Sequence, residues 1–211
     1  MSESLTIDRV AIEGSYPSGG VVEVWTINRP NKLNALNSDV VAGLKAACKD
    51  AEDDADVRVV VIRGASPEPA GEGKRQKPPA FVAGADITEF VGKKPKEIRA
   101  IFENNAWEAI WNLSKPTIAS IDGFALGGGS EIALSCDLRI ASTRSNFGTP
   151  EINLGLIPGG GATQRLARLL GYGKAIEMVM TGEMVSATEA YRIGLVNRLC
   201  EPDELQNTTM Q

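Results

Sequence analysis

Two glycine-rich segments could together hold negative charge. Gly127, Gly128 and Gly129 stand between an expected strand and an expected helix in FALGGGSE, so their backbone N–H groups can point at an anion. In FVAGAD, Gly84 permits an unusual turn that can present the N–H of Ala85. Two N–H donors from different strand ends are what a developing enolate or alkoxide oxygen requires. The sequence therefore predicts an oxyanion site.

Two glutamates are the candidate proton-transfer groups. Glu131 lies three residues after Gly128, which places both on one face of the expected helix. Glu151, in FGTPEINLGLIPGGG, stands between Pro150 and a glycine-rich loop among apolar residues. If the two carboxyl groups converge, they could share a proton near neutral pH, leaving one as base and one as acid. Taken alone, either residue also fits a solvated or helix-capping acid, and spacing leaves their convergence open.

The sequence has 211 residues and no histidine. Without imidazole there is no Ser-His-Asp or Cys-His nucleophile and no histidine metal site, so acid–base work falls to carboxylates, Lys, Tyr or Cys. The glycine-rich segments also lack the spacing of a dinucleotide fingerprint or a nucleophile elbow, because Ile132 and Gln164 stand where those motifs need glycine. Neither a metal nor a separate cofactor is expected.

Composition limits the partners and the compartment. The formal net charge of −5 argues against nucleic acid or an anionic membrane as a bulk electrostatic partner. Cys48, Cys136 and Cys200 are far apart and odd in number, which favours reduced, buried thiols in a cytosolic protein. The N-terminus lacks a signal-like pattern, and no apolar stretch approaches the length of a membrane span. We expect a cytoplasmic protein without membrane association.

Hydrophobic periodicity predicts alternating strands and helices. The expected strands are 5–12 and 21–27 as a β-hairpin, then 57–63, 116–121, 138–142 and a closing strand in LVNRLC. The expected helices are one from Asn37 or Ser38 to 53, a turn capped by Asp86, a longer helix after Pro95 through Ile98, Ile101, Phe102, Ala109, Ile110 and Leu113, one opened by the glycine triplet, two between 159 and 181 separated by Gly171, and one capped by Ser186. Residues 65–80 form a long exposed loop. This alternation indicates an α/β fold with mostly parallel pairing.

The last ten residues, PDELQNTTMQ, resemble a helix start. Pro202 suits a first helical position, and Asp203 and Glu204 place acid in the first turn. The sequence offers this helix nothing to dock against, which suggests that a C-terminal segment is absent.

Five blocks resemble, in order and character, the enoyl-CoA hydratase/isomerase family, the crotonases. They are NRPNKLNALN, AFVAGADITEF, KPTIASIDGFALGGGSEIALSCDLRIAS, FGTPEINLGLIPGGGATQRLARLLG and AYRIGLVNRL. The resemblance implies a spiral core of repeated ββα units, which we assign to residues 1–201, with residues 202–211 beginning a C-terminal helical segment that is otherwise missing. The family continues past this point with helices that complete a trimer, so a homotrimer or a dimer of trimers is expected if that region is present.

The resemblance also implies a site and a reaction. The N–H groups of Ala85 and Gly128 match the two donors that hold a thioester oxygen in the family. Hydratase members carry glutamates at the positions of Glu131 and Glu151, which favours reversible hydration of a short trans-2-enoyl-CoA. By this analogy Glu131 acts chiefly on the water and Glu151 supplies the Cα proton.

Further positions match the family's substrate contacts. An acyl-CoA thioester is the expected partner, with CoA part of the substrate, and the matching residues are Lys32, Ala83, Asp86, Ile87, Thr88 and Gly159. Without the resemblance, Asp86 reads as a helix cap, Lys32 as a solvated charge and Gly159 as a plain turn. The loop 65–80 is longer than is usual in the family, near the expected path of CoA.

Three alternatives remain open from the sequence. A Δ3,Δ2-enoyl-CoA isomerase would use one glutamate to shuttle a proton. A non-catalytic member of the fold could bind acyl-CoA or RNA, although the acidic composition and the intact glutamate pair count against it. A two-carboxylate glycosidase fits the paired acids but not the backbone N–H donors or the 5% aromatic content.

Overall fold

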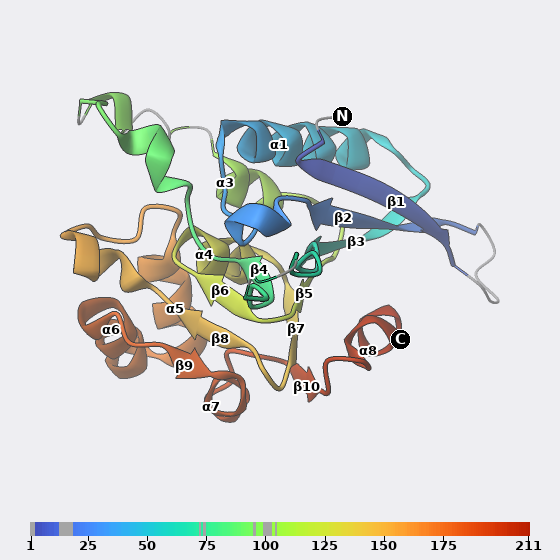
Figure 1. Ribbon diagram of the computed structural model, residues 1–211. Helices are drawn as coiled ribbons and strands as arrows, with labels where there is room; N and C mark the ends of the chain where they lie inside the picture. Colours follow the sequence, from blue (N-terminus) through green and yellow to red (C-terminus); the bar gives the residue numbers. More distant parts are fainter. Residues whose placement is uncertain are drawn as a thin grey trace.

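The larger sheet of the computed structural model has six strands in the order β1-β2-β3-β5-β7-β10 (Figure 1). The structure describes residues 3–12, 19–71, 73, 75–94, 96–98, 103 and 105–211. The strands are β1 (Leu5–Ala11), β2 (Val21–Ile27), β3 (Val57–Gly64), β5 (Thr117–Ile121), β7 (Leu138–Ser142) and β10 (Arg198–Cys200). The predicted hairpin is confirmed, because β1 and β2 pair antiparallel, and the pairings from β2 to β10 are parallel.

The two faces of this sheet differ in what covers them. Trp25, Ile27 and Ile62 are fully buried and join Leu44 of helix α1 (Ser38–Asp53) in the main core. Alternate residues such as Thr26 and Arg63 point to the opposite face, where they line a cavity beside helix α8 (Leu205–Met210). Figure 1 shows α1 and α3 (Ala106–Trp111) on one side of the sheet and α8 on the other.

A second sheet has four short strands in the order β4-β6-β8-β9. They are β4 (Ala80–Val82), β6 (Phe124–Leu126), β8 (Asn146–Gly148) and β9 (Val185–Ser186). The remaining helices are α4 (Gly128–Ser135), α5 (Ala162–Leu170), α6 (Tyr172–Thr181), α7 (Ala187–Arg192) and the 3-10 helices η1 (Pro30–Lys32), η2 (Ile87–Phe90) and η3 (Pro150–Leu154). The predicted α/β class is confirmed, and α4 begins in the glycine triplet, as expected, although the strand directly before it, β6, is separate from the predicted strand 116–121.

Side-chain caps start the helices where the sequence predicts. The Asn37 side chain accepts from the backbone of Val40 and begins α1. Asp86 caps η2 and Ser186 caps α7 in the same way. Gly171 separates α5 from α6, as predicted.

The predicted long helix after Pro95 is wrong as a single element. Residues 96–98 are helical, but Asn105 is extended, at φ −97° and ψ 171°, and its side chain accepts from the backbone N–H of Glu108. This cap starts a separate helix, α3, because an extended N-cap residue cannot continue a preceding helix. Ile101 and Phe102, two predicted apolar positions of the long helix, lie outside the described residues.

The expectation of an undocked C-terminal helix is also wrong. Helix α8 begins at Leu205, three residues after Pro202, and packs against β5 and β7. Thr209 lies 2.9 Å from Ser120 of β5, oxygen to oxygen, and both Leu205 and Thr209 are buried. The Ser120 hydroxyl on β5 supplies a docking contact that periodicity does not reveal. The boundary drawn at residue 201 stays a prediction.

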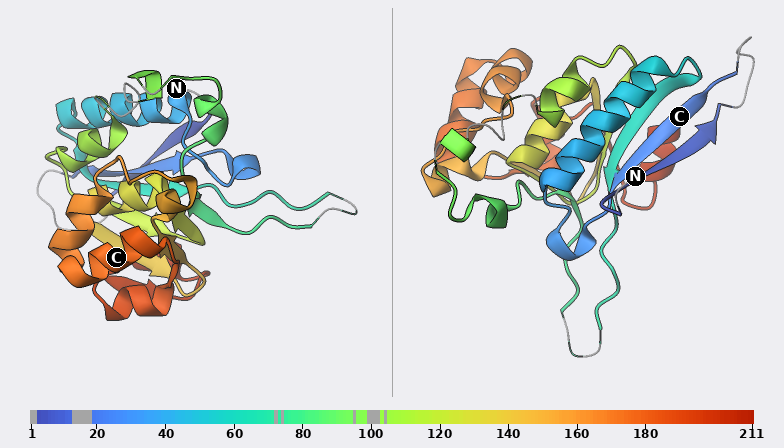
Figure 2. Two further views of the ribbon diagram at one scale, coloured as in Figure 1. Left: turned by 90° about the vertical axis from the view of Figure 1, so that its left-hand side faces the viewer. Right: turned by 90° about the horizontal axis from the view of Figure 1, so that it is seen from above.

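The loop after β3 projects from the body as an arm. Figure 2 shows residues 65–71 running out from the body and residues 75–79 running back. Gln76 ties the two limbs together, because its side chain accepts from the N–H of Ala70 and donates to the carbonyl of Glu68. The predicted exposed loop is thus confirmed, with β4 starting at its final residue, Ala80.

The state of the cysteines agrees in part with the prediction of reduced, buried thiols. All three cysteines are free; Cys48 and Cys136 are buried as predicted, whereas Cys200 is only half-buried. Burial raises the pKa of Cys48 and of Cys136 to about 12.

Among the described helices, none combines the length and the apolar character that crossing a membrane would need.

Candidate active site

Glu131 lies in the first turn of α4 and is 1% exposed. Its Oε1 atom accepts two backbone hydrogen bonds, from the N–H of Gly160 at 2.7 Å and from the N–H of Ala162 at 3.1 Å. These donors come from the segment that leads into α5, so the carboxyl group is held between two elements. Two N–H groups on one oxygen stabilise the ionised form and leave Oε2 free for chemistry.

The environment of Glu131 places its titration near neutrality. Burial raises the pKa of Glu131 to about 7, and the carboxyl group of Glu151 adds repulsion in the same direction. The N–H groups of Ala162 and Gly160 and the guanidinium of Arg165 oppose this rise. A carboxyl group with a pKa near 7 can both take and release a proton at physiological pH.

Glu151 stands in the first turn of η3 and lies beside the start of α4. A Cβ placed on Gly127 would lie 3.2 Å from Glu151 Oε1, so this carboxyl group sits beside the glycine triplet. Its Oε2 atom is buried and has no hydrogen-bond partner among the described residues. Burial also raises the pKa of Glu151, which favours the protonated, proton-donating form. The structure thus brings the two predicted glutamates to one site.

The two expected N–H donors also lie side by side. Gly128 is the first residue of α4, and a Cβ placed on it would lie 3.7 Å from the nitrogen of Ala85. Gly84 and Gly127, which precede the two donors, have φ values of +113° and +52° that glycine adopts readily. Within the part of the chain that the structure describes, neither donor N–H has an acceptor. Both are available to one external oxygen.

Close packing around the triplet fixes this geometry. A Cβ on Gly129 would lie 2.0 Å from the carbonyl oxygen of Val82, so α4 rests directly on the backbone of β4. The indole N–H of Trp107 donates to the carbonyl of Gly128 at 2.9 Å. Trp107 and Leu36 stand at 3.2 and 3.3 Å from the space where a Gly128 Cβ would be. The site therefore has apolar walls beside the free N–H groups.

The segments of the expected substrate contacts pair with one another. The N–H of Ala83 donates to the carbonyl of Leu33 at 3.0 Å, and the N–H of Asp86 donates to the carbonyl of Leu36 at 2.7 Å. This pairing brings the segment after η1, which ends at the exposed Lys32, beside the segment after β4 that carries Ala85.

The side chains of the individual contact residues differ in exposure and pairing. Asp86 accepts from Thr88 and forms an ion pair with Arg29 at 2.8 Å. The Thr88 hydroxyl, the Arg29 guanidinium and the Thr88 N–H lower the pKa of Asp86. Ile87 is 60% exposed, and Gly159 is exposed beside the buried Gly160. The cap role of Asp86 is confirmed, and its substrate contact stays a prediction.

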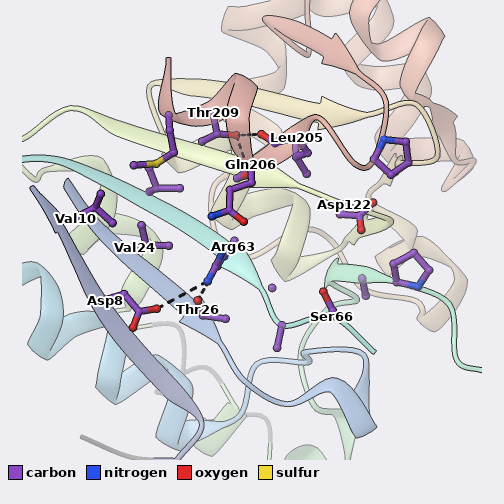
Figure 3. A pocket seen from close by; sticks show the side chains of 18 residues that line it. Asp8, Val10, Val24, Thr26, Arg63, Ser66, Asp122, Leu205, Gln206 and Thr209 are labelled. Carbon is purple, nitrogen blue, oxygen red and sulfur yellow. Dashed lines mark hydrogen bonds and ion pairs between the residues drawn. The ribbon is translucent and has the colours of Figure 1, made fainter. Parts of the chain in front are cut away.

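A separate cavity of about 750 Å³ lies on the outer face of the six-stranded sheet. Figure 3 shows Arg63 in it, bonded to Thr26 at 2.9 Å and paired with Asp8 at 3.8 Å. None of the predicted site residues lines this cavity. Arg63 therefore contacts both Thr26 and Asp8 in this cavity. Among the described residues, no group of carboxylates and thiols is arranged to hold a metal ion.

Sequence reasoning missed the residues that hold Glu131. Gly160 and Ala162 supply its hydrogen bonds, Trp107 anchors Gly128, and Arg165 donates to the carbonyl of Gly160 at 2.6 Å. The run GGGA at 159–162 was a usable signal, because consecutive glycines before a helix expose N–H groups. Nothing in the sequence marked the acceptor of those groups.

Comparison with known proteins identifies the family. The family model described as Enoyl-CoA hydratase/isomerase matches residues 18–211. A short-chain-enoyl-CoA hydratase of Clostridium acetobutylicum is 47% identical over 194 residues, covering 91% of this chain and 70% of that protein. A crotonyl-CoA hydratase of Syntrophomonas wolfei is 41% identical over 184 residues, covering 86% of this chain and 66% of that protein.

Solved structures agree in fold. The crystal structure of an enoyl-CoA hydratase from Bacillus anthracis superposes with a TM-score of 0.82 at 34% identity, covering 98% of this chain and 74% of that one. One from Geobacillus kaustophilus gives a TM-score of 0.80 at 39% identity, covering 99% of this chain and 74% of that one. The architecture is the crotonase fold, and the chain belongs to the enoyl-CoA hydratase/isomerase family.

Proposed function

We propose that this protein is an enoyl-CoA hydratase that adds water reversibly to a short trans-2-enoyl-CoA such as crotonyl-CoA. The observation that carries the proposal is the meeting of Glu131 and Glu151 beside the free N–H groups of Ala85 and Gly128. The names of the two relatives, a short-chain-enoyl-CoA hydratase and a crotonyl-CoA hydratase, support the same substrate class.

The backbone donors act on the thioester oxygen. As a nucleophile attacks Cβ, charge develops on this oxygen, and the N–H groups of Ala85 and Gly128 stabilise it without having to reorient. Removing one such donor costs about 3–4 kcal/mol in comparable sites. Because Gly84 and Trp107 already fix the two peptides, the chain pays little reorganisation at the moment of reaction.

The glutamates divide the proton work. The Glu131 carboxylate, held by two N–H groups, takes a proton from the water whose oxygen forms the new bond to Cβ. Glu151, whose raised pKa favours the protonated form, gives its proton to Cα. Water is thus divided between Cβ and Cα, and transfer of one proton from Glu131 to Glu151 restores the starting state.

Loss of the enoyl-thioester absorbance of crotonyl-CoA tests the proposal. We expect Glu131→Gln and Glu151→Gln each to lower kcat by about 100-fold or more, because each removes an acid–base group while keeping the side-chain shape. The exposed Glu183 provides a matched control, and Glu183→Gln is expected to keep wild-type turnover. Undiminished turnover in both site variants would contradict the two-glutamate mechanism.

Heavy-oxygen water separates hydration from the isomerisation that the family also includes. Hydration places the labelled oxygen in the product, whereas a Δ3,Δ2-isomerase only moves a proton and leaves the product unlabelled. RNA binding that is sensitive to salt, without turnover or CoA binding, would instead support a non-catalytic role. The homotrimer, or dimer of trimers, stays a prediction that light scattering in solution checks.

A further inference from the structure

Arg165, in the first turns of α5, folds back over the segment that holds Glu131. Its Nη1 atom donates to the carbonyl of Gly160 at 2.6 Å, and its guanidinium lies over the ring of Trp111 at 4.8 Å from the centroid. A Cβ on Gly161 would lie 2.1 Å from Nη1, so this glycine leaves the space that the guanidinium fills. Gly161 also has a φ of +108°, which brings the chain into α5 at this point.

The same short segment carries both hydrogen bonds to Glu131. The N–H groups of Gly160 and Ala162 converge on Oε1, on the inner side of the segment. Arg165 fastens the Gly160 carbonyl from α5, and Trp111 on α3 supports the guanidinium from outside. Rotation of the Gly160–Gly161 peptide would therefore have to break the Arg165 bond as well as disturb the bonds to Glu131.

We propose that Arg165 is a positioning residue for hydration: it clamps the Gly160–Ala162 segment so that Glu131 Oε2 is presented to the attacking water. The inference rests on the proposed function of Glu131. Arg165 acts through the backbone and through its charge, since its guanidinium donates to the carbonyl of Gly160 and not to the carboxyl group.

The charge of Arg165 adds a second effect on Glu131. Two charged side chains act on this carboxyl group: Glu151 from η3 raises its pKa, and Arg165 from α5 lowers it. Arg165 in turn faces Glu131, Glu108 on α3 and Arg168 on its own helix. Of these charged side chains, Arg165 is the one that stabilises the Glu131 carboxylate. Removing its guanidinium must therefore raise the pKa of Glu131.

Steady-state kinetics on crotonyl-CoA across pH test both effects. For Arg165→Met we expect kcat to fall about 10- to 100-fold, as for a misplaced catalytic group, with KM changed by less than about threefold. The acid limb of kcat/KM should move to higher pH, because Glu131 must then be deprotonated from a higher pKa. For Arg165→Lys, which keeps the charge, the limb should stay at its wild-type position and kcat should recover in part.

Arg168→Met is the matched control. Arg168 lies on the same helix and carries the same charge, but it is exposed and holds no part of the 160–162 segment. We expect it to keep wild-type kcat and acid limb. Wild-type kcat and an unmoved limb in Arg165→Met, or equal losses in Arg168→Met, would overturn the proposal. If Arg165→Met fails to fold by circular dichroism, Arg165→Gln replaces it with the same expected limb shift.

A readout without turnover separates this inference from the proposed function. In protein labelled with ¹³C at the glutamate side-chain carboxyl carbon, the Glu131 signal is assigned by its loss in Glu131→Gln and titrated by NMR. Arg165→Met should move that titration to higher pH even if the wild-type enzyme leaves crotonyl-CoA unchanged, in which case only the hydratase proposal fails. An unmoved Glu131 titration would contradict the electrostatic role of Arg165.

Discussion

Helix α4 and the 3-10 helix η3 each present one glutamate to the site, but they are built in opposite ways. All eight residues of α4 are buried, whereas none of the five residues of η3 is. Glu131 on α4 has two hydrogen bonds to Oε1, while Glu151 on η3 has a buried Oε2 with no partner among the described residues. The Glu131 carboxyl group is held by two donors, whereas one oxygen of the Glu151 carboxyl group has no partner among the described residues.

This difference suits two different tasks. A base that orients water must be held at a fixed position, and the backbone donors of Gly160 and Ala162 do this for Glu131. A carboxyl group whose oxygen lacks a partner can turn its proton toward a substrate carbon without first breaking a bond, as we propose for Glu151. Orphaned buried polar atoms of this kind are rare in folded proteins and cost stability, so they point to function.

Glycine substitutions should show the contrast in packing most strongly. For Gly129→Ala in α4 we expect a loss of at least about 3 kcal/mol in the free energy of unfolding, because the new Cβ would meet the Val82 carbonyl oxygen at 2.0 Å. Gly155→Ala, just after η3, meets nothing within 4 Å and suffers only from its φ of +68°, which costs about 1 kcal/mol. Urea unfolding monitored by circular dichroism measures both.

Equal losses in the free energy of unfolding in Gly129→Ala and Gly155→Ala would contradict the difference in packing between α4 and η3. Gly173→Ala in α6 is the reference for the intrinsic effect of the methyl group, since its Cβ meets open space and its φ is not positive. It should stabilise the protein by up to about 1 kcal/mol, because alanine favours a helix more than glycine does.

The burial of Glu131 should make stability depend on pH. Its pKa of about 7 in the folded protein exceeds the 4.5 of an unperturbed side chain, so the folded state binds the proton more tightly. Stability from this group is therefore present below pH 4.5 and is lost as pH rises to about 7. Glu131→Gln removes that loss, and its gain should reach at most about 3 kcal/mol above pH 7.

Thermal unfolding of Glu131→Gln and the parent at pH 5 and pH 8 measures this gain. Glu151→Gln should shift stability in the same direction and by less, because Glu151 is only half-buried. A Glu131→Gln variant that is less stable than the parent at pH 8 would show that the two N–H donors outweigh burial.

Much of this contrast was visible in the sequence, and part of it was not. The glycine triplet predicted the start of α4, and the spacing of Glu131 predicted its face, because both follow from helix geometry. The second sheet was not predicted from the sequence, because strands as short as Asn146–Gly148 and Val185–Ser186 contain too few residues to show an alternating pattern. Helix η3 was not predicted either, because its five residues are too few to show a helical pattern.

The convergence of the site was a matter of tertiary structure. Glu131 and Gly160 lie 29 residues apart, and Trp107 and Gly128 lie 21 apart, with no local pattern that links either pair. Helix α8 docks through the hydroxyl groups of Thr209 and Ser120, which lie 89 residues apart in the sequence. Neither residue stands out in the sequence from other Ser and Thr residues. Family resemblance implied the pairing of the glutamates, whereas the residues that support them are recognised only in the folded structure.

The pH dependence of turnover tests which glutamate is the base. If Glu131 must be ionised, kcat/KM for crotonyl-CoA should fall about tenfold per pH unit below about pH 7. Because Glu151 is protonated in the proposed active form, Glu151→Gln keeps a neutral group beside Glu131, and this limb should stay in place in the residual activity. A limb that moves to lower pH would show that an ionised Glu151 repels Glu131 in the wild-type enzyme, and one that disappears would make Glu151 the base.

Truncating a leucine to alanine should change the free energy of unfolding little in η3 and much more in α4. Leu154 is 64% exposed at the end of η3, so Leu154→Ala is expected to change the free energy of unfolding by no more than about 0.5 kcal/mol. The same truncation in α4, Leu134→Ala, removes a side chain that is 3% exposed and should cost about 2–5 kcal/mol. Urea midpoints of the two variants compare the regions with identical chemistry. A loss at Leu154 close to that at Leu134 would mean that the exposed side of η3 is covered in solution, and that Glu151 is as firmly held as Glu131.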